Sequence, residues 1–266
     1  MDGRQADRLS RQGIENILGD AGGGLEIKVL SCTDSTNAEV GRAARLGAAE
    51  GLTVIADTQT QGRGRRGRGF FSPPSTGLYL SLLLRPENCD ANRTLKITTA
   101  AAVAVCDAIS AAGGERAGIK WVNDVFMNGK KVCGILTESS LDQNGRTEYA
   151  VLGVGINLYR PPQGFPPELE NIAGAVFDSP RDGLGNQVAA EFLRSFMGFY
   201  RQPDYGDYAR SYHQLSIVLG RRVKVISASG TTEATVLDID GECRLAVRYD
   251  DGSTDLLCSG EISIKL

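Results

Sequence analysis

The chain contains 266 residues, and its 29 Lys and Arg residues against 32 Asp and Glu residues give a formal net charge of −3 at pH 7. The length predicts one large domain with a small one, and the slightly acidic charge excludes a whole-protein attraction to nucleic acid or anionic lipid, so any basic site must be local. Because His213 is the one histidine in the sequence, a zinc site built from several histidines is excluded, and a histidine-based triad could rest only on that residue.

The six cysteines form no Cys-x-x-Cys pair and are widely spaced. This spacing predicts reduced thiols in a cytoplasmic protein, each serving as a small buried apolar residue, and not a disulfide framework. The N-terminus lacks a secretory apolar region, and Thr98, Thr99 and Asp107 interrupt the Ala-rich run at 97–112. Neither segment is typical of a signal peptide or a membrane span, so we expect a soluble protein.

The first third of the chain alternates helical and apolar strand-like patterns. Periodicity predicts helices at 8–18 and 38–51, strands at 25–30, 52–56 and 78–85, and a polar loop at 57–76. Ser35 or Thr36 can cap the second helix. A polar loop of this length inside a compact domain is typical of a functional or disordered segment.

The middle of the chain predicts a long helix, four short strands and another helix. The helices are expected at 92–112 and 187–202, the strands at 117–121, 124–127, 131–140 and 148–158, and a loop at 161–186. Asn128-Gly129 is a turn signal that makes residues 120–136 resemble a β-hairpin.

After about Leu215 the pattern changes to short alternating strands separated by Gly and Asp turns, which is typical of a small barrel-like β module. The predicted fold class is therefore α+β, with a mixed-sheet domain at 1–215 followed by a β-barrel domain at 216–266.

Residues 61–69 concentrate four arginines and four glycines. Glycine lets main-chain N–H groups approach an anion closely, while arginine supplies forked donors, so this segment favours a polyphosphate ligand. An RNA-binding segment and a solvated linker remain alternatives. The acidic total charge and the lack of interleaved aromatic residues weigh against RNA.

Lysine is rare in this chain, yet three lysines lie at 120, 130 and 131. If the hairpin forms, Lys131 begins a strand from which its ammonium could reach a carboxylate and a phosphate together. Asp124, on the other arm, could accept a proton, hold a cation or pair with a lysine. Residues 153–157, Gly-Val-Gly-Ile-Asn, are expected to follow a strand, but no third glycine follows them, and this excludes a dinucleotide-binding turn.

Five segments taken together resemble the biotin protein ligase family: residues 34–37, Gln59 with 62–68, 120–124, 129–136 and 153–157. The resemblance implies a catalytic fold shared with class II aminoacyl-tRNA synthetases and lipoate ligases, followed by an SH3-like domain. It also implies a two-step reaction in which biotin and ATP form biotinyl-5′-AMP, and a lysine of a biotin carboxyl carrier domain then attacks it. ATP, Mg²⁺ and biotin are the implied ligands.

The resemblance also assigns roles to individual residues. It implies that the biotin ring is contacted by Ser35, Thr36, Asn37 and Gln59, and that a loop with Gly62, Arg63, Gly64 and Arg65 closes over the adenylate. It implies that the biotin carboxylate and phosphate are bound by Lys131 with Gly134. Asn157 is the implied adenine contact, and Asp124 is the implied aspartate that orients the incoming lysine. No residue is assigned to hold a metal. Val122 stands where the family commonly has Pro, and Phe70 where it often has Trp.

Other functions make different demands on the sequence. Lipoate and octanoyl ligases favour a His-Asp element, which His213 does not provide, and some biotin ligases carry a winged-helix DNA-binding domain. About 24 residues precede the first predicted strand, so we expect no such domain and no DNA binding. An RNA-binding protein is the third alternative. Homodimerisation is left open.

Overall fold

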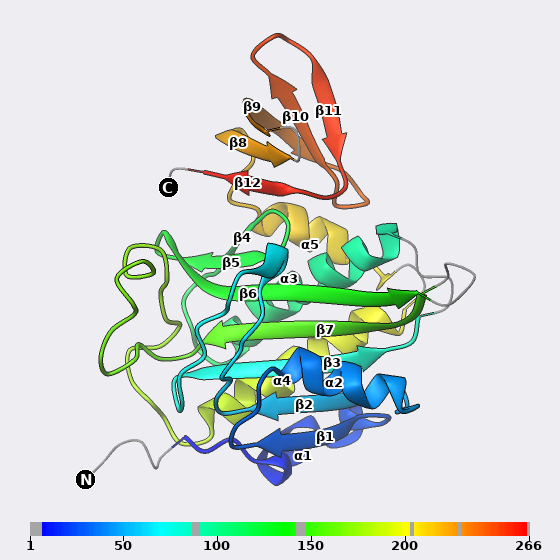
Figure 1. Ribbon diagram of the computed structural model, residues 1–266, viewed down its shortest axis with the longest axis vertical. Coiled ribbons are helices and arrows are strands. Elements are labelled where there is room, and N and C mark those ends of the chain that lie inside the picture. The colour runs from blue at the N-terminus through cyan, green and yellow to red at the C-terminus, as the bar shows by residue number, and fades with distance from the viewer. Residues whose placement is uncertain (1–6, 87–90, 142–146, 203–204, 228–229, 265–266) are drawn as a thin grey trace.

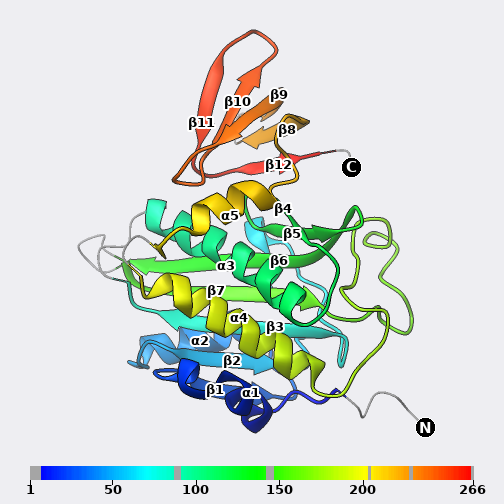
Figure 2. The same ribbon diagram turned by 180° about the vertical axis from the view of Figure 1, so that it is seen from behind.

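The computed structural model describes residues 7–86, 91–141, 147–202, 205–227 and 230–264. A large mixed sheet carries helices across one face, and a smaller β module sits beyond its β4 edge (Figure 1). Viewed from behind, two long helices cross the sheet diagonally (Figure 2). The α+β fold class predicted from the sequence is therefore confirmed.

The large sheet has seven strands in the order β1-β2-β3-β7-β6-β5-β4. The strands are β1 Glu26–Leu30, β2 Leu52–Ala56, β3 Gly77–Leu84, β4 Gly118–Lys120, β5 Asp124–Met127, β6 Lys130–Leu141 and β7 Thr147–Asn157. Only β1 and β2 pair in parallel, and the other neighbours are antiparallel. All eight residues of β3 are buried, because β3 lies inside the sheet with both of its faces covered.

Five α-helices pack with this sheet: α1 Arg11–Leu18, α2 Thr36–Arg45, α3 Ala91–Ala111, α4 Leu184–Tyr200 and α5 Tyr208–Leu215. The segment Thr94–Ala111 of α3 is long and apolar enough to cross a membrane, but 72% of it is buried inside the protein. It is therefore explained as a helix of the protein core. Short α5 was not predicted, since its eight residues carry only a brief apolar repeat.

The smaller sheet is antiparallel in the order β11-β10-β9-β8-β12. Its strands are β8 Arg222–Ser227, β9 Gly230–Ile239, β10 Leu245–Tyr249, β11 Thr254–Leu257 and β12 Glu261–Ser263. Trp121 Nε1 donates to the Cys243 carbonyl at 2.9 Å, so the indole anchors this module to the large sheet. The exact boundary at 215/216 stays a prediction.

The prediction that every cysteine is buried was wrong for two residues. Of the described cysteines, all are free; Cys106, Cys133 and Cys243 are buried, whereas Cys32 and Cys258 are exposed. The exposed pair lies in short connections after β1 and β11, where no layer covers the chain. Burial raises the pKa of the Cys106 thiol to about 12 and that of Cys243 to about 11. Cys89 lies outside the described residues.

Two further local predictions need correction. Ser35 occupies the N-cap position of α2, but its side chain makes no capping hydrogen bond. Instead, the Asp34 carboxylate accepts from Ser35 N at 2.7 Å and pairs with Arg42 at 2.8 Å, which holds the pKa of Asp34 well below its usual range. Residues 153–157 form the last part of β7 and do not follow it, so the predicted strand at 148–158 is confirmed and the reading of 153–157 as a turn after a strand is corrected.

The predicted hairpin turn is confirmed, and it generates a stability test. Asn128 and Gly129 have φ of 49° and 74°, as a type I′ turn between β5 and β6 requires. Gly129→Ala meets no neighbouring atom but is strained at this φ. It should lower the free energy of unfolding by about 1 kcal/mol. Gly198→Ala, in the last turn of α4 where a Cβ meets no neighbour, should raise it by about 0.5 kcal/mol. Urea denaturation measures both, and equal shifts would contradict the turn geometry.

Candidate active site

A cavity of about 380 Å³ opens on the face of the large sheet opposite α3 and α4. Its walls come from the start of α2, the loop between β2 and β3, the strands β5 to β7, the loop before α4, and β12 of the small module. Among the residues predicted from the sequence, those that line it are Ser35, Thr36, Asn37, Gln59, Arg63, Gly64, Arg65, Asp124, Lys131, Gly134 and Asn157. Segments distant in the chain thus meet at one place.

Gly62 does not line the cavity. A Cβ there would lie 2.3 Å from the Phe70 carbonyl oxygen and 2.6 Å from Ser72 Oγ. Phe70 N donates to the Gly62 carbonyl at 2.8 Å, so this close approach folds residues 61–69, the arginine-rich loop, back on themselves. Gly62 therefore shapes the loop, and its absent side chain is what permits the turn.

Strand β7 forms the floor of the cavity at two glycines, which have no side chain of their own. A Cβ at Gly155 would lie 2.6 Å from the Phe70 ring, and one at Gly153 would lie 2.0 Å from Asn37 Oδ1. These glycines therefore leave the space in which an aromatic ring and an amide can lie directly on the sheet. The sequence showed the Gly-Val-Gly pattern, but it contained no signal for the residues that fill the space.

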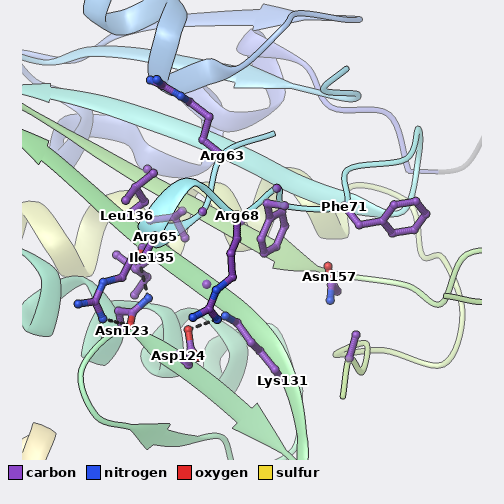
Figure 3. Close-up of a pocket in the computed structure, with 18 of the residues that line it drawn as sticks. Arg63, Arg65, Arg68, Phe71, Asn123, Asp124, Lys131, Ile135, Leu136 and Asn157 are labelled. Atoms are coloured by element: carbon purple, nitrogen blue, oxygen red, sulfur yellow. Dashed lines mark hydrogen bonds and ion pairs between the residues drawn. The ribbon is translucent and has the colours of Figure 1, made fainter. Parts of the chain in front are cut away.

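Lys131 and Asp124 face each other across the hairpin, with Nζ and Oδ1 2.6 Å apart (Figure 3). The contact is an ion pair without the angles of a hydrogen bond. Of the three roles that the sequence left open for Asp124, pairing with a lysine is the one present. Lys120 lies close by, and burial lowers the pKa of its ammonium, a shift that Asp124 partly opposes.

Arg65 joins three parts of the molecule. Its guanidinium donates to Asn123 Oδ1 at 2.8 Å and to the Gly260 carbonyl of the small module at 2.7 Å. Burial lowers the pKa of Arg65, although arginine remains charged at neutral pH. The side chain therefore brings a positive charge into the cavity while holding the loop against both sheets.

Glu261 on β12 also holds the arginine-rich loop. It forms ion pairs with Arg68 and, at 3.5 Å, with Arg66, and hydrogen bonding from Arg68 lowers the pKa of the Glu261 carboxyl. Sequence reasoning missed this residue, because an isolated glutamate in a β module carries no local signal for a partner about 195 positions away.

Arg63 has a different environment from Arg65. Its side chain points away from Asp124 and Lys131 (Figure 3) and forms an ion pair with Glu138 on β6, with Nη1 and Oε1 3.2 Å apart. On the opposite wall, Asn157 Nδ2 donates to the Gly174 carbonyl at 3.0 Å. The backbone of Lys131 pairs with Ile172 and Gly174 of the same wall at 2.8 Å each, so residues 172–174 are fixed to β6.

Comparison with known proteins gives consistent matches. Residues 29–157 match the biotin/lipoate A/B protein ligase family, and residues 218–265 match the biotin protein ligase C terminal domain. The chain is 34% identical over 230 residues to the bifunctional ligase/repressor BirA of Bacillus subtilis, covering 84% of this chain and 69% of that protein. It is 29% identical over 255 residues to the biotin--[acetyl-CoA-carboxylase] ligase of Mycobacterium tuberculosis, covering 93% and 92%.

Solved structures show the same fold. The biotin protein ligase from Aquifex aeolicus in complex with biotin and ATP superimposes with a TM-score of 0.73 at 24% identity, covering 90% of this chain and 98% of that one.

The contacts of Glu261 predict how firmly the loop is held. Glu261→Gln removes the charge that pairs with two arginines, so the free energy that favours the closed loop should fall by about 1 kcal/mol. This corresponds to a population of the open loop that is about fivefold higher. Trypsin should therefore cleave the native protein within residues 63–68 about fivefold faster, as mass spectrometry of the fragments can measure. Glu233→Gln, which removes pairs with Lys224 and Arg222 elsewhere in the module, is the control. Equal cleavage in both variants would show that Glu261 does not restrain the loop.

Proposed function

The chain belongs to the biotin/lipoate A/B protein ligase family, and we propose from this premise that it activates biotin with ATP and transfers it to a lysine of a biotin carboxyl carrier domain. ATP-dependent biotin ligation is the activity that the family, the relatives and the fold support together. The match of the small module to the biotin protein ligase C terminal domain favours biotin over lipoate. One observation carries the proposal: a single cavity joins polar groups beside α2 to Lys131 and Arg65.

In the first step a biotin carboxylate oxygen attacks the α-phosphorus of ATP, and pyrophosphate leaves. Repulsion between these two anions opposes the attack, and the charges of Lys131 and Arg65 reduce it. We assign Ser35, Thr36, Asn37 and Gln59 to the end that holds the biotin ring. Asn157 is assigned to adenine, with Gly134 supplying space on the floor. The cavity thereby aligns the two reactants.

In the second step the amine of the carrier lysine attacks the acyl carbon, AMP leaves, and the amine loses a proton. Asp124 lies beside Lys131 and is assigned to orient this amine. Gly64 and Arg65 keep the arginine-rich loop over the mixed anhydride, where exclusion of water protects it from hydrolysis.

Magnesium is proposed to enter as part of the ATP complex. Among the residues that the structure describes, no group of three His, Cys, Asp or Glu side chains could hold a metal ion. Mg²⁺ is commonly held by substrate phosphates and water with few protein ligands, which fits this arrangement. Bound in that way, the ion would neutralise phosphate charge.

The carrier is proposed to be the biotin-carrier domain of an acetyl-CoA or acyl-CoA carboxylase, and the compartment to be the cytoplasm. The oligomeric state stays open, and the lack of DNA binding stays a prediction. Analytical ultracentrifugation with and without biotin measures the first, and a gel-shift assay measures the second.

Pyrophosphate release that depends on biotin tests the first step. Lys131→Ala removes the ammonium beside the reacting groups and should reduce this release on the order of 10²–10³-fold. Lys224→Ala, a lysine on β8 of the small module, controls for loss of positive charge. Normal biotinyl-AMP synthesis by the Lys131 variant would refute the role of this residue, and the absence of biotin-dependent release from the unmodified protein would refute the function.

Retention of the intermediate tests the loop. Arg65→Gly loses the contacts to Asn123 and Gly260, so biotinyl-AMP should leave the site early and biotinylate lysines of unrelated proteins. Arg65→Lys keeps the charge but lacks the fork that reaches both acceptors, so its release rate should be intermediate. Filter-binding measures the release rate, and serum albumin reports promiscuous labelling. Unchanged retention in Arg65→Gly would contradict the lid model.

A further inference from the structure

Lys120 is the last residue of β4, and it lines the cavity. Its ammonium lies over the Phe126 ring, 5.8 Å from the ring centroid, and within the described part of the chain it makes no ion pair and no hydrogen bond. Burial lowers the pKa of this ammonium, because the group is partly shielded from water. A shielded cation that lacks an acceptor would be stabilised by an anionic ligand.

The carboxylates whose charges act on Lys120 are each engaged by another cation. Asp124 stands opposite Lys120 in the register of β4 and β5, but its Oδ1 lies 2.6 Å from Lys131 Nζ. Glu261 of the small module forms its ion pair with Arg68. Both negative charges are therefore matched elsewhere, and the charge of Lys120 remains available to a ligand.

The order of the strands places Lys120 far from the end of the cavity that is assigned to the biotin ring. Thr36, at that end, has its Oγ1 2.7 Å from Ser81 Oγ on β3. Lys131 begins β6, and Lys120 lies on β4, two strands further across the sheet. Since neighbouring strands are about 4.8 Å apart, β4 lies about 10 Å beyond β6. Thr36, Lys131 and Lys120 thus follow one another across the sheet.

The chemistry of the first step fixes where the leaving group goes. A biotin carboxylate oxygen bonds to the α-phosphorus of ATP, the bond from that phosphorus to the bridging oxygen breaks, and its electron pair stays on pyrophosphate. The attacking and leaving oxygens lie roughly in line on opposite sides of the phosphorus. With the biotin ring beside Thr36 and the α-phosphate beside Lys131, the leaving oxygen points toward β4.

We propose that Lys120 is a catalytic residue of the first step, where its ammonium stabilises the negative charge that develops on the leaving pyrophosphate. The inference rests on the proposed function and gives the cations of the cavity different tasks. Lys131 and Arg65 reduce the repulsion between the two reactants, and Lys120 receives the leaving group. In the second step AMP leaves and no pyrophosphate is present, so Lys120 has no part in that step.

Adenylation by Lys120→Met tests the proposal, because methionine keeps an unbranched apolar side chain and removes the ammonium. Pyrophosphate release that depends on biotin should fall on the order of 10²-fold. The KM for biotin should change by less than about twofold, since the ring-binding end is untouched. Lys120→Arg keeps a cation and should recover part of the rate. Thermal melting curves establish that the variants are folded, and Lys120→Gln gives the same test if the methionine variant is not.

The two half-reactions measured separately distinguish a leaving-group role from a structural one. Transfer of biotin from synthetic biotinyl-AMP to a biotin carboxyl carrier domain should stay within about twofold in Lys120→Met. The reverse of the first step, in which biotinyl-AMP and pyrophosphate form ATP, should need about tenfold more pyrophosphate for its half-maximal rate. Equal losses in adenylation and transfer would overturn the proposal, and so would an unchanged requirement for pyrophosphate.

Lys28→Met is the matched control. Lys28 lies on β1, at the opposite edge of the same sheet, where its exposed ammonium pairs with Glu26 at 3.0 Å. Its loss changes the net charge by the same amount, so both half-reactions should keep their rates. A loss of adenylation as large as that in Lys120→Met would show that total charge matters and not the position of Lys120.

The unmodified protein separates the two levels of inference. If it shows no biotin-dependent pyrophosphate release, the proposed function fails and the role of Lys120 fails with it. If it is active and Lys120→Met releases pyrophosphate at the normal rate, the role of Lys120 alone is refuted.

Discussion

The partly buried guanidinium of Arg65 sets the main constraint on this structure. A buried charge is costly unless its donors are satisfied, and here the acceptors come from different parts of the chain: Asn123 before β5 and Gly260 before β12. The loop, the large sheet and the small module must all be aligned for both contacts to form. Asn123 is fixed in turn, since its Nδ2 donates to the Ile135 carbonyl at 2.9 Å. One side chain therefore ties loop closure to the position of the small module.

The same constraint explains the charge of the cavity. The acceptors of Arg65 are neutral oxygens, so its positive charge is not cancelled by them, and the partly buried Lys120 adds another positive charge. Burial disfavours both charged forms, and an anionic ligand would offset that cost. The Asp124 carboxylate compensates Lys131 at 2.6 Å. The cavity thus combines a cationic end suited to phosphate with an uncharged, hydrogen-bonding end around Thr36 and Gln59.

Many of these features were open to prediction because their signals are local. The Asn128-Gly129 turn demands positive φ at both residues and pairs Met127 with Lys130 and Phe126 with Lys131, which brings Lys131 onto the same hairpin as Asp124. The α+β fold class with a second, β domain was predicted from the change to short alternating strands after Leu215. The cationic loop was predicted from its arginine and glycine content. Gly62 belongs to the predicted loop but does not line the cavity, since a glycine that contacts a ligand and one that permits a tight turn look alike in sequence.

The sequence by itself thus determined most of the helices and strands, though not α5, together with the hairpin, the cationic loop and the set of residues that resemble a biotin ligase, because each depends on neighbours a few positions apart. Only the tertiary structure decided which of them meet. Glu261 reaches the arginine-rich loop from the end of the chain, and Phe70 lies on Gly155 of β7. Glu138 accepts a hydrogen bond from Asn37, about 100 residues away along the chain. Contacts between distant segments depend on sheet order and register, and no local pattern encodes either.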